Sequence, residues 1–307
     1  MKLHHLLLAT VALTGVALAD NPLLAPSDLP FHAPRFDQIK VADYQPALEE
    51  GMKLQAAEIE TIANNPEPPT FDNTLVAMER SGAVLSHVDM IFEAIVQADS
   101  SRQLEKVHAT EAPRLAAHQD SIYQNAKLFQ RVQTVYDQRD KLDPVSQHLL
   151  EITYQLFIKA GAKLPPDQQA RLRALNKEEA SLSTRFHDRL LADTNAHAVL
   201  VTDRAELQGL TAADLAAARN AKKKGWLFAL ENTTQQPITT SMANAALRQR
   251  VLSASESRGD HPGTNDLRGV ITRLANIRAE RAHMLGYASA AAFYLSDQMA
   301  KTPDAAE

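Results

Sequence analysis

Apolar residues recur at steps of three or four along most of this chain, and that periodicity is the strongest constraint on its fold. Such spacing is typical of amphipathic helices that bury one face. Glycine, which weakens helices, occurs only 10 times in 307 residues. The sequence therefore predicts a mostly α fold. The main stripes are Leu75, Met78, Gly82, Leu85, Val88, Phe92 and Ile95; Leu149, Ile152, Leu156 and Phe157; Leu172, Leu175, Leu182, Phe186 and Leu190; and Leu267, Val270, Ile271, Leu274, Ile277 and Leu285.

One segment departs from the helical pattern. Gly225 to Leu230 is a short apolar run, and ENTTQQPITT follows it. We interpret the run as a strand and the polar segment as a turn, so that a strand or small hairpin is expected near 226–241. Trp226 and Phe228 are expected to be core residues. Before the first stripe, the Pro-rich residues 21–46 are expected to be an extended lead-in.

Other short elements are expected at the C-terminal end. Residues 289–300 are expected to form a helix after the one that ends at Gly286. Thr302, Pro303 and Asp304 then have the residue types of a helix start. Only three residues follow, whereas an isolated helix needs about 12–15 to be even marginal in water. This segment is either a frayed tail or the start of a helix in a longer chain.

The first 19 residues have the pattern of a secretory signal peptide. Lys2 precedes the apolar run 6–18, and Ala17-Leu18-Ala19 is a small-x-small cleavage site. We expect cleavage before Asp20 and export of residues 20–307 as one helical region, periplasmic or secreted, with no membrane segment left after cleavage. The chain has no Cys, so neither a lipid-anchor cysteine nor a disulfide is available.

Motifs of enzymatic chemistry are absent from the sequence. The formal net charge of −5 also argues against a nucleic-acid partner. Zinc hydrolases commonly carry HExxH, in which two His bind the metal and the Glu acts as general base. None of the 11 His residues is followed by Glu. No Gly-x-Ser-x-Gly, Walker or GxGxxG motif occurs either. The sequence thus provides no catalytic, cofactor-binding or metal-binding residue, and we expect this chain to bind no metal itself.

Two weaker signals have ordinary structural explanations. Glu105 with His108, and Glu280 with His283, have the Glu-x-x-His spacing of di-iron bundles, but such pairs are also common neighbours on a helix surface. Lys222 to Lys224 precede Gly225 and are interpreted as the solvated, positively charged end of a helix rather than an anion site.

Three stretches resemble a known family. NPLLAPSDLPFHAPRFDQI with NNPEPPTFDNTLVAMERSG, then ENTTQQP, and then IRAERAHMLGYASAAAFYLSDQMAKTP occur in matching order along the chain. They are similar to the N-terminal region of the thimet-type oligopeptidases, zinc metallopeptidases, and most similar to the dipeptidyl carboxypeptidase (peptidyl-dipeptidase) branch.

The resemblance implies an incomplete fold, namely the N-terminal helical part of a two-lobed, mostly α enzyme. It implies that the zinc site, HExxH with a further Glu ligand, lies in a C-terminal catalytic region downstream of Met299 to Pro303. No catalytic or metal-binding residue of the family can be carried over to this chain, and Thr302-Pro303-Asp304 would start a helix that the family continues.

Three functions remain open at this stage. The first is the front part of an exported zinc peptidyl-dipeptidase that releases C-terminal dipeptides from oligopeptides, inactive alone because HExxH is absent. The second is a non-enzymatic helical scaffold or peptide-binding protein. The third is the di-iron bundle.

Overall fold

The structure is a computed structural model that describes residues 21–307, so the expected signal peptide lies outside the described residues. Two compact units are distinguished: residues 21–181 together with 277–307 form the first unit, and residues 182–276 form the second. The boundary between them falls inside two helices, α8 (Pro166–Ala196) and α12 (Arg268–Met284).

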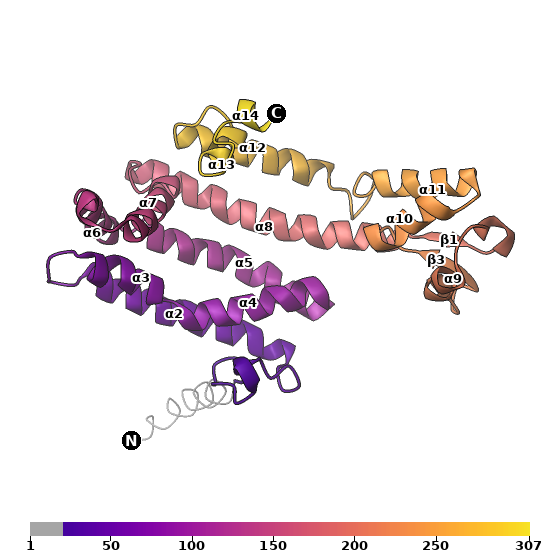
Figure 1. The fold of residues 1–307 in the computed structure, drawn as a ribbon, viewed down its shortest axis with the longest axis horizontal. Coiled ribbons are helices and arrows are strands. Elements are labelled where there is room, and N and C mark those ends of the chain that lie inside the picture. Colours follow the sequence, from indigo (N-terminus) through magenta and orange to yellow (C-terminus); the bar gives the residue numbers. More distant parts are fainter. Residues whose placement is uncertain (1–20) are drawn as a thin grey trace, which may run out of the picture. The chain divides into compact units, whose positions relative to one another are not determined.

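The first unit is helical, as the sequence predicts (Figure 1). A π-helical turn covers Phe71–Val76, and 3-10 turns cover Pro30–His32 and Arg139–Lys141. Its α-helices, besides its parts of α8 and α12, are α2 (Val41–Ala63), α3 (Ala77–Arg80), α4 (Ala83–Ala98), α5 (Arg102–Tyr123), α6 (Ala126–Tyr136), α7 (Pro144–Lys159), α13 (Ala290–Leu295) and α14 (Pro303–Ala306).

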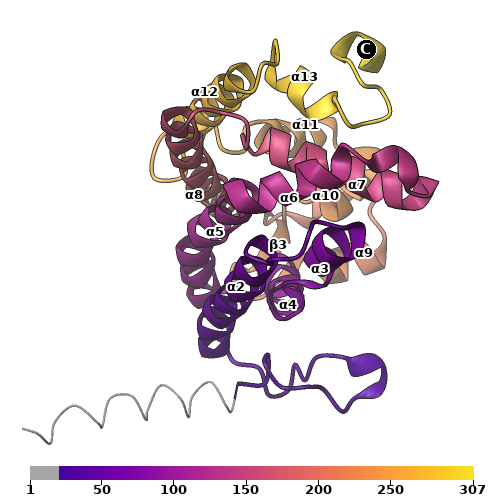
Figure 2. The ribbon, with the colours of Figure 1, turned by 90° about the vertical axis from the view of Figure 1, so that its left-hand side faces the viewer.

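Helix α2 organises the N-terminal half of the first unit. It packs against α4, α5 and α6, and α2 runs beside α4 in both views (Figure 1 and Figure 2). A Cβ atom at Gly51 would lie 2.9 Å from Cα of Leu85, so glycine permits the close approach of α2 to α4. The apolar core beside this crossing consists of Leu23, Tyr44, Ala47, Leu48, Leu85, Val88, Ile91, Phe92, Val96 and Leu104.

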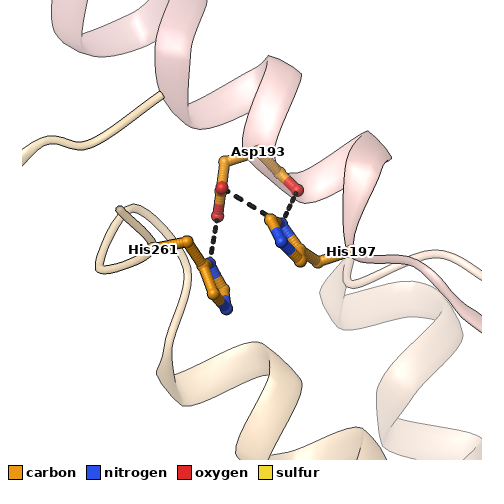
Figure 3. A group of neighbouring side chains, drawn as sticks. All are labelled: Asp193, His197 and His261. Carbon is orange, nitrogen blue, oxygen red and sulfur yellow. Dashed lines mark hydrogen bonds and ion pairs between the residues drawn. The ribbon is translucent and has the colours of Figure 1, made fainter. Parts of the chain in front are cut away.

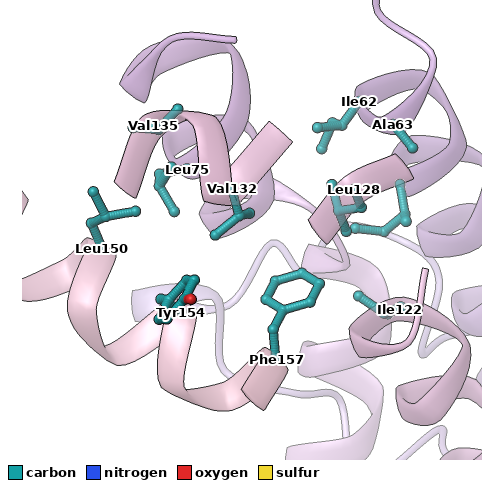
Figure 4. Close-up of a cluster of buried hydrophobic side chains, with 11 residues drawn as sticks. Ile62, Ala63, Leu75, Ile122, Leu128, Val132, Val135, Leu150, Tyr154 and Phe157 are labelled. Carbon is teal, nitrogen blue, oxygen red and sulfur yellow. The ribbon is translucent and has the colours of Figure 1, made fainter. Parts of the chain in front are cut away.

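A second core in the same unit is centred on α6 and α7. Its side chains converge from α2, the Phe71–Val76 turn and α5 as well (Figure 4). Phe157 is fully buried there, with the ring of Tyr123 edge-on at 5.1 Å between centroids. Arg131, on α6, is also buried and donates hydrogen bonds to the carbonyl oxygens of Asn65 and Glu67. This core therefore also fixes the Pro-rich loop between α2 and α3.

The second unit combines helices with a small antiparallel sheet of order β1-β3-β2. Val199 pairs with Phe228, and Arg219 pairs with Trp226. Val201, Phe228 and Leu230 are buried in its core. The helices contribute Ile238 and Val251, and Met242 comes from the segment between these helices. Besides its parts of α8 and α12, the elements are β1 (Val199–Val201), a 3-10 turn (Arg204–Leu207), α9 (Ala212–Ala218), β2 (Arg219–Asn220), β3 (Gly225–Phe228), α10 (Asn232–Ser241) and α11 (Ala245–Glu256).

The strand near 226 is confirmed, but the segment after it is not a turn. Residues 232–241 form α10, and Ile238 and Met242 are buried against the strands. Burial of these apolar side chains outweighs the weak helix propensity of the Thr-rich sequence. The hairpin lies on the other side of β3, between β2 and β3. Lys222 to Lys224 belong to its turn and not to a helix end, since α9 ends at Ala218.

Two expected helices differ in extent. The stripe 75–95 is interrupted at Gly82, which has φ +73° and donates its N–H to the carboxylate of Glu58 on α2 at 2.7 Å. The helix expected over 289–300 ends at Leu295. The lead-in is also shorter than expected, because Pro46 lies within α2.

The stripe on α7 is only partly buried. Phe157 is inside, but Ile152 is 47% exposed and Leu156 is 41% exposed. The buried face instead carries Leu150, Thr153, Tyr154 and Phe157. The spacing of apolar residues predicts the helix α7 correctly. It does not predict which face of α7 is buried in the first unit.

The long charged helix and the helix ending at Gly286 are confirmed as α8 and α12. Thr302 does cap α14, with its hydroxyl accepting from the N–H of Ala305. Among the described residues, no helix is long and apolar enough to span a membrane.

Candidate functional site

One group of side chains in the described residues combines the ligand types of a metal site, and it lies within the second unit. Asp193 occupies the last turn of α8, and His197 follows one turn later, just past the helix end. His261 comes from the loop between α11 and α12, 68 residues from Asp193. Figure 3 shows the three side chains converging. Asp193 is 1% exposed, whereas both imidazoles are partly open to solvent.

The Asp193 carboxylate is the centre of this group. Its Oδ2 accepts the backbone N–H of Gly259 at 2.8 Å and lies 3.1 Å from Nδ1 of His261. Nδ1 of His197 lies 3.0 Å from the backbone oxygen of Asp193 and 3.1 Å from its Oδ1. The two imidazole rings stack with centroids 3.7 Å apart and planes 11° from parallel.

Gly259 shapes the loop that delivers His261. Its φ of +75° favours glycine, and a Cβ atom there would lie 2.6 Å from Cδ1 of Leu267. The carbonyl of Gly259 accepts the N–H of Leu267 at 2.8 Å, and Leu267 is buried. The loop is thus held on one side by the core and on the other by Asp193.

Opposing effects act on the Asp193 carboxyl. Burial by itself raises the pKa of this group. The N–H of Gly259 and the imidazoles of His261 and His197 favour the charged form and outweigh burial, so the pKa lies below the ordinary aspartate value. The group therefore contains a buried anion at neutral pH.

The arrangement does not match a hydrolase triad. Ser257, His261 and Asp193 supply the residue types, and the Oγ of Ser257 lies 3.4 Å from Nε2 of His261. That contact is long, and the same hydroxyl donates to the carbonyl of Ser253 at 2.8 Å. The Ser257 proton is therefore directed away from the imidazole that would have to accept it.

The group also does not match the zinc site that the resemblance implies. In HExxH both His ligands belong to one helical turn and enclose a general-base Glu. Here the two His come from different segments, and no His in the chain is followed by Glu. We therefore derive no hydrolytic step from these residues.

The weaker signals in the sequence form no common site. His108 pairs with Glu93 of α4 at 3.4 Å, while Glu280 pairs with Arg171 of α8. Nε2 of His283 lies 3.1 Å from the carbonyl of Ala288. Within residues 21–307, neither Glu-x-x-His pair belongs to a cluster of possible metal ligands, which leaves no support for the di-iron bundle.

The sequence motifs do not identify Asp193, His197 and His261 as one group. The Asp-x-x-x-His spacing of Asp193 and His197 is visible, but its third member, His261, becomes adjacent only through the loop geometry at Gly259.

A cavity of about 270 Å³ lies in the first unit, among α2, α4, α5 and α7. His118 lines it and has a pKa lowered by burial, with Nε2 2.7 Å from the side-chain oxygen of Gln55. Asp89 lines it as well, and burial raises the pKa of that carboxyl. These groups make the cavity polar, but they pair no nucleophile with a base.

Replacement of Asp193 by Asn should lower the stability of the second unit by about 1–3 kcal/mol at pH 7, because the amide carries no charge and keeps only one of the two acceptor oxygens. The lowered pKa of Asp193 stabilises the fold above the unfolded-state value, and this stabilisation is lost as pH falls through the folded-state value. Asp193→Asn should therefore show a shallower loss of stability below about pH 4. Fluorescence of Trp226, the sole tryptophan, measures unfolding of this unit in urea at each pH.

Asp260→Asn is the matched control, because Asp260 lies in the same loop but is exposed and makes only a surface ion pair with Arg268. Identical pH profiles for Asp193→Asn and the unsubstituted chain would contradict the role given to Asp193.

Comparison with known proteins extends the resemblance seen in the sequence. No protein-family model matches the chain. Dipeptidyl carboxypeptidase of Escherichia coli (strain K12) is 42% identical over an alignment of 293 residues that covers 93% of this chain and 43% of that protein. The dipeptidyl carboxypeptidase of Salmonella typhimurium is 41% identical over 94% of this chain and 44% of its own length. Oligopeptidase A of E. coli is 25% identical over 92% of this chain and 42% of its own length.

The chain thus spans less than half the length of the curated relatives that it matches. Within that span the identity is higher to the dipeptidyl carboxypeptidases than to oligopeptidase A. The chain belongs to the thimet-type oligopeptidase family, in its dipeptidyl carboxypeptidase branch.

Proposed function

We propose that this chain is the N-terminal, non-catalytic part of an exported zinc peptidyl-dipeptidase. The observation that carries the proposal is a mismatch of lengths: the similarity covers 93% of this chain but 43% of the E. coli relative, and HExxH is absent from all 307 residues. The catalytic zinc site is accordingly assigned to a downstream region, and residues 20–307 to the helical body beside it.

The substrates of the whole enzyme are proposed to be oligopeptides, from which dipeptides are released at the C-terminus. The matched relatives named dipeptidyl carboxypeptidase support this class. Part of the wall around the substrate would come from the helices of this chain, which restrict access to short, unfolded peptides.

A complementation assay tests whether this chain is the helical body and the downstream region holds the catalytic site. The chain alone should release no dipeptide, and the downstream remainder of the E. coli relative alone should release little. Co-expression of the two should give dipeptide release that a metal chelator abolishes, because the helical body and the region proposed to hold the metal are then present together. Each half expressed alone is the control.

Two results would count against the proposal. Metal-dependent peptidase activity of the purified chain alone would place catalysis within residues 20–307. A well-folded chain that neither cleaves peptides nor complements the remainder would favour the alternative, a helical scaffold or peptide-binding protein.

Export is part of the proposal and rests on residues 1–19. Cleavage after Ala19 should give exported protein that begins at Asp20, because Ala17 and Ala19 provide the small side chains that the cleavage site requires. Mass spectrometry of periplasmic or secreted material measures the N-terminus directly. Exported protein that retains Met1 would refute this assignment.

A further inference from the structure

The buried carboxylate of Asp193 has an oxygen that lacks a hydrogen bond. Its Oδ2 is satisfied by Gly259 and His261, but Oδ1 is buried without a hydrogen-bond partner. Nδ1 of His197 lies 3.1 Å from this oxygen, yet it forms its hydrogen bond with the backbone oxygen of Asp193. A buried anionic oxygen without a donor is costly, and a cation at this position would remove the cost.

The nitrogen atoms beside the two carboxylate oxygens of Asp193 are spaced as metal ligands are, with His197 at Oδ1 and His261 at Oδ2. Nδ1 of His197 and Nδ1 of His261 each lie 3.1 Å from a carboxylate oxygen of Asp193. Two ligands about 2.1 Å from an ion at a tetrahedral angle are about 3.4 Å apart. The three ligand atoms offered by the group all lie within 4.8 Å of one another.

The surroundings also have the features of a metal site. The ligating carboxylate would be held in place by the N–H of Gly259, in the way that outer hydrogen bonds orient metal ligands. The imidazoles are 39% and 31% exposed, which gives an ion a path and leaves room for water as a fourth ligand. Two imidazoles and one carboxylate suit zinc and similar transition metals, whereas magnesium and calcium prefer oxygen ligands.

Metal binding requires two changes. Each ligating Nδ1 must lose its proton, because Nδ1 of His197 donates to the backbone oxygen of Asp193 in this structure. The ring planes are 11° from parallel, and the lone pair of each nitrogen lies in its ring plane, so both Nδ1 atoms cannot point at one ion as drawn in Figure 3. One imidazole must turn about its Cβ–Cγ bond. His261 is the ring that can turn, since it lies in a loop and its Nε2 makes a long 3.4 Å contact with Ser257.

We propose that Asp193, His197 and His261 bind one divalent transition-metal ion of the zinc class, which ties the loop after α11 to the end of α8. The two His ligands of this site come from different segments of the chain, so it is not an HExxH site. It departs from the expectation, based on sequence alone, that this chain binds no metal, and it does not depend on the proposed peptidase function.

Metal binding by the untagged chain tests the proposal. Equilibrium dialysis against Zn²⁺ should give one tightly bound equivalent, and Co²⁺ should give the intense visible absorption of a low-coordinate site. His197→Gln and His261→Gln should each bind at least about tenfold more weakly, since loss of even an outer-shell partner commonly costs 10- to 100-fold. His187→Gln, an exposed residue on the same helix, should bind as the unsubstituted chain does.

Far-ultraviolet circular dichroism and Trp226 fluorescence verify that each variant is folded before binding is compared. The proposal is overturned if the unsubstituted chain binds no stoichiometric Zn²⁺, or if His197→Gln and His261→Gln both bind with unchanged affinity. Since the readout is metal bound per chain, failure of the peptidase proposal would not alter it. Conversely, a failure to bind zinc at this site would not change the result expected in the complementation assay.

Discussion

The close approach of α2 to α4 at Gly51 is the constraint on which the first unit depends. Any side chain at this position would meet the backbone of Leu85 at 2.9 Å, so the two helices can bury their apolar faces together only over a glycine. Tyr44 and Phe92, with ring centroids 5.2 Å apart, pack within the same core. Because the chain has no cysteine, such packing must hold the helices in place without a disulfide.

The second unit is stabilised differently, with a polar anchor beside its apolar core. Val201, Phe228 and Leu230 bury the sheet against its helices, while Asp193 holds the loop at Gly259 through a backbone N–H. The hydrogen-bonded Oδ2 of Asp193 fixes the loop geometry. The buried Oδ1 has no hydrogen bond, and a bound cation would stabilise it. The proposed metal site follows from that second property.

Much of the fold could be predicted from the sequence, because α8 and α12 carry long stripes with Pro before one and Gly after the other. Helix ends that are set by contacts between residues distant in sequence could not be predicted in this way. The break at Gly82 is fixed by Glu58 of α2, and α10 forms because the strands give Ile238 a buried position.

The Asp193 group could not be predicted for a similar reason. Asp193 and His197 share a helical spacing, but His261 reaches them only because Gly259 adopts a positive φ. By contrast, the family could be identified from the sequence, because several stretches spread along the chain resemble the same family in matching order. The comparisons bear that out over 93% of the chain.

We propose that this chain is the helical body of a longer enzyme, and one side of α7 is both apolar and exposed. Val145, Ile152 and Leu156 lie on one side of α7 and are 79%, 47% and 41% exposed. Contiguous exposed apolar patches mark interaction sites or favour association, and these three side chains share one side of the helix.

The proposal is tested by measuring how much hydrophobic dye the purified chain binds and how its association state changes with concentration. We expect dye binding and concentration-dependent association, both reduced in the double variant Ile152→Gln, Leu156→Gln, while the helical circular-dichroism signal is unchanged. A dye-negative monomer that melts sharply and cooperatively would contradict it, and would instead indicate a self-contained helical protein.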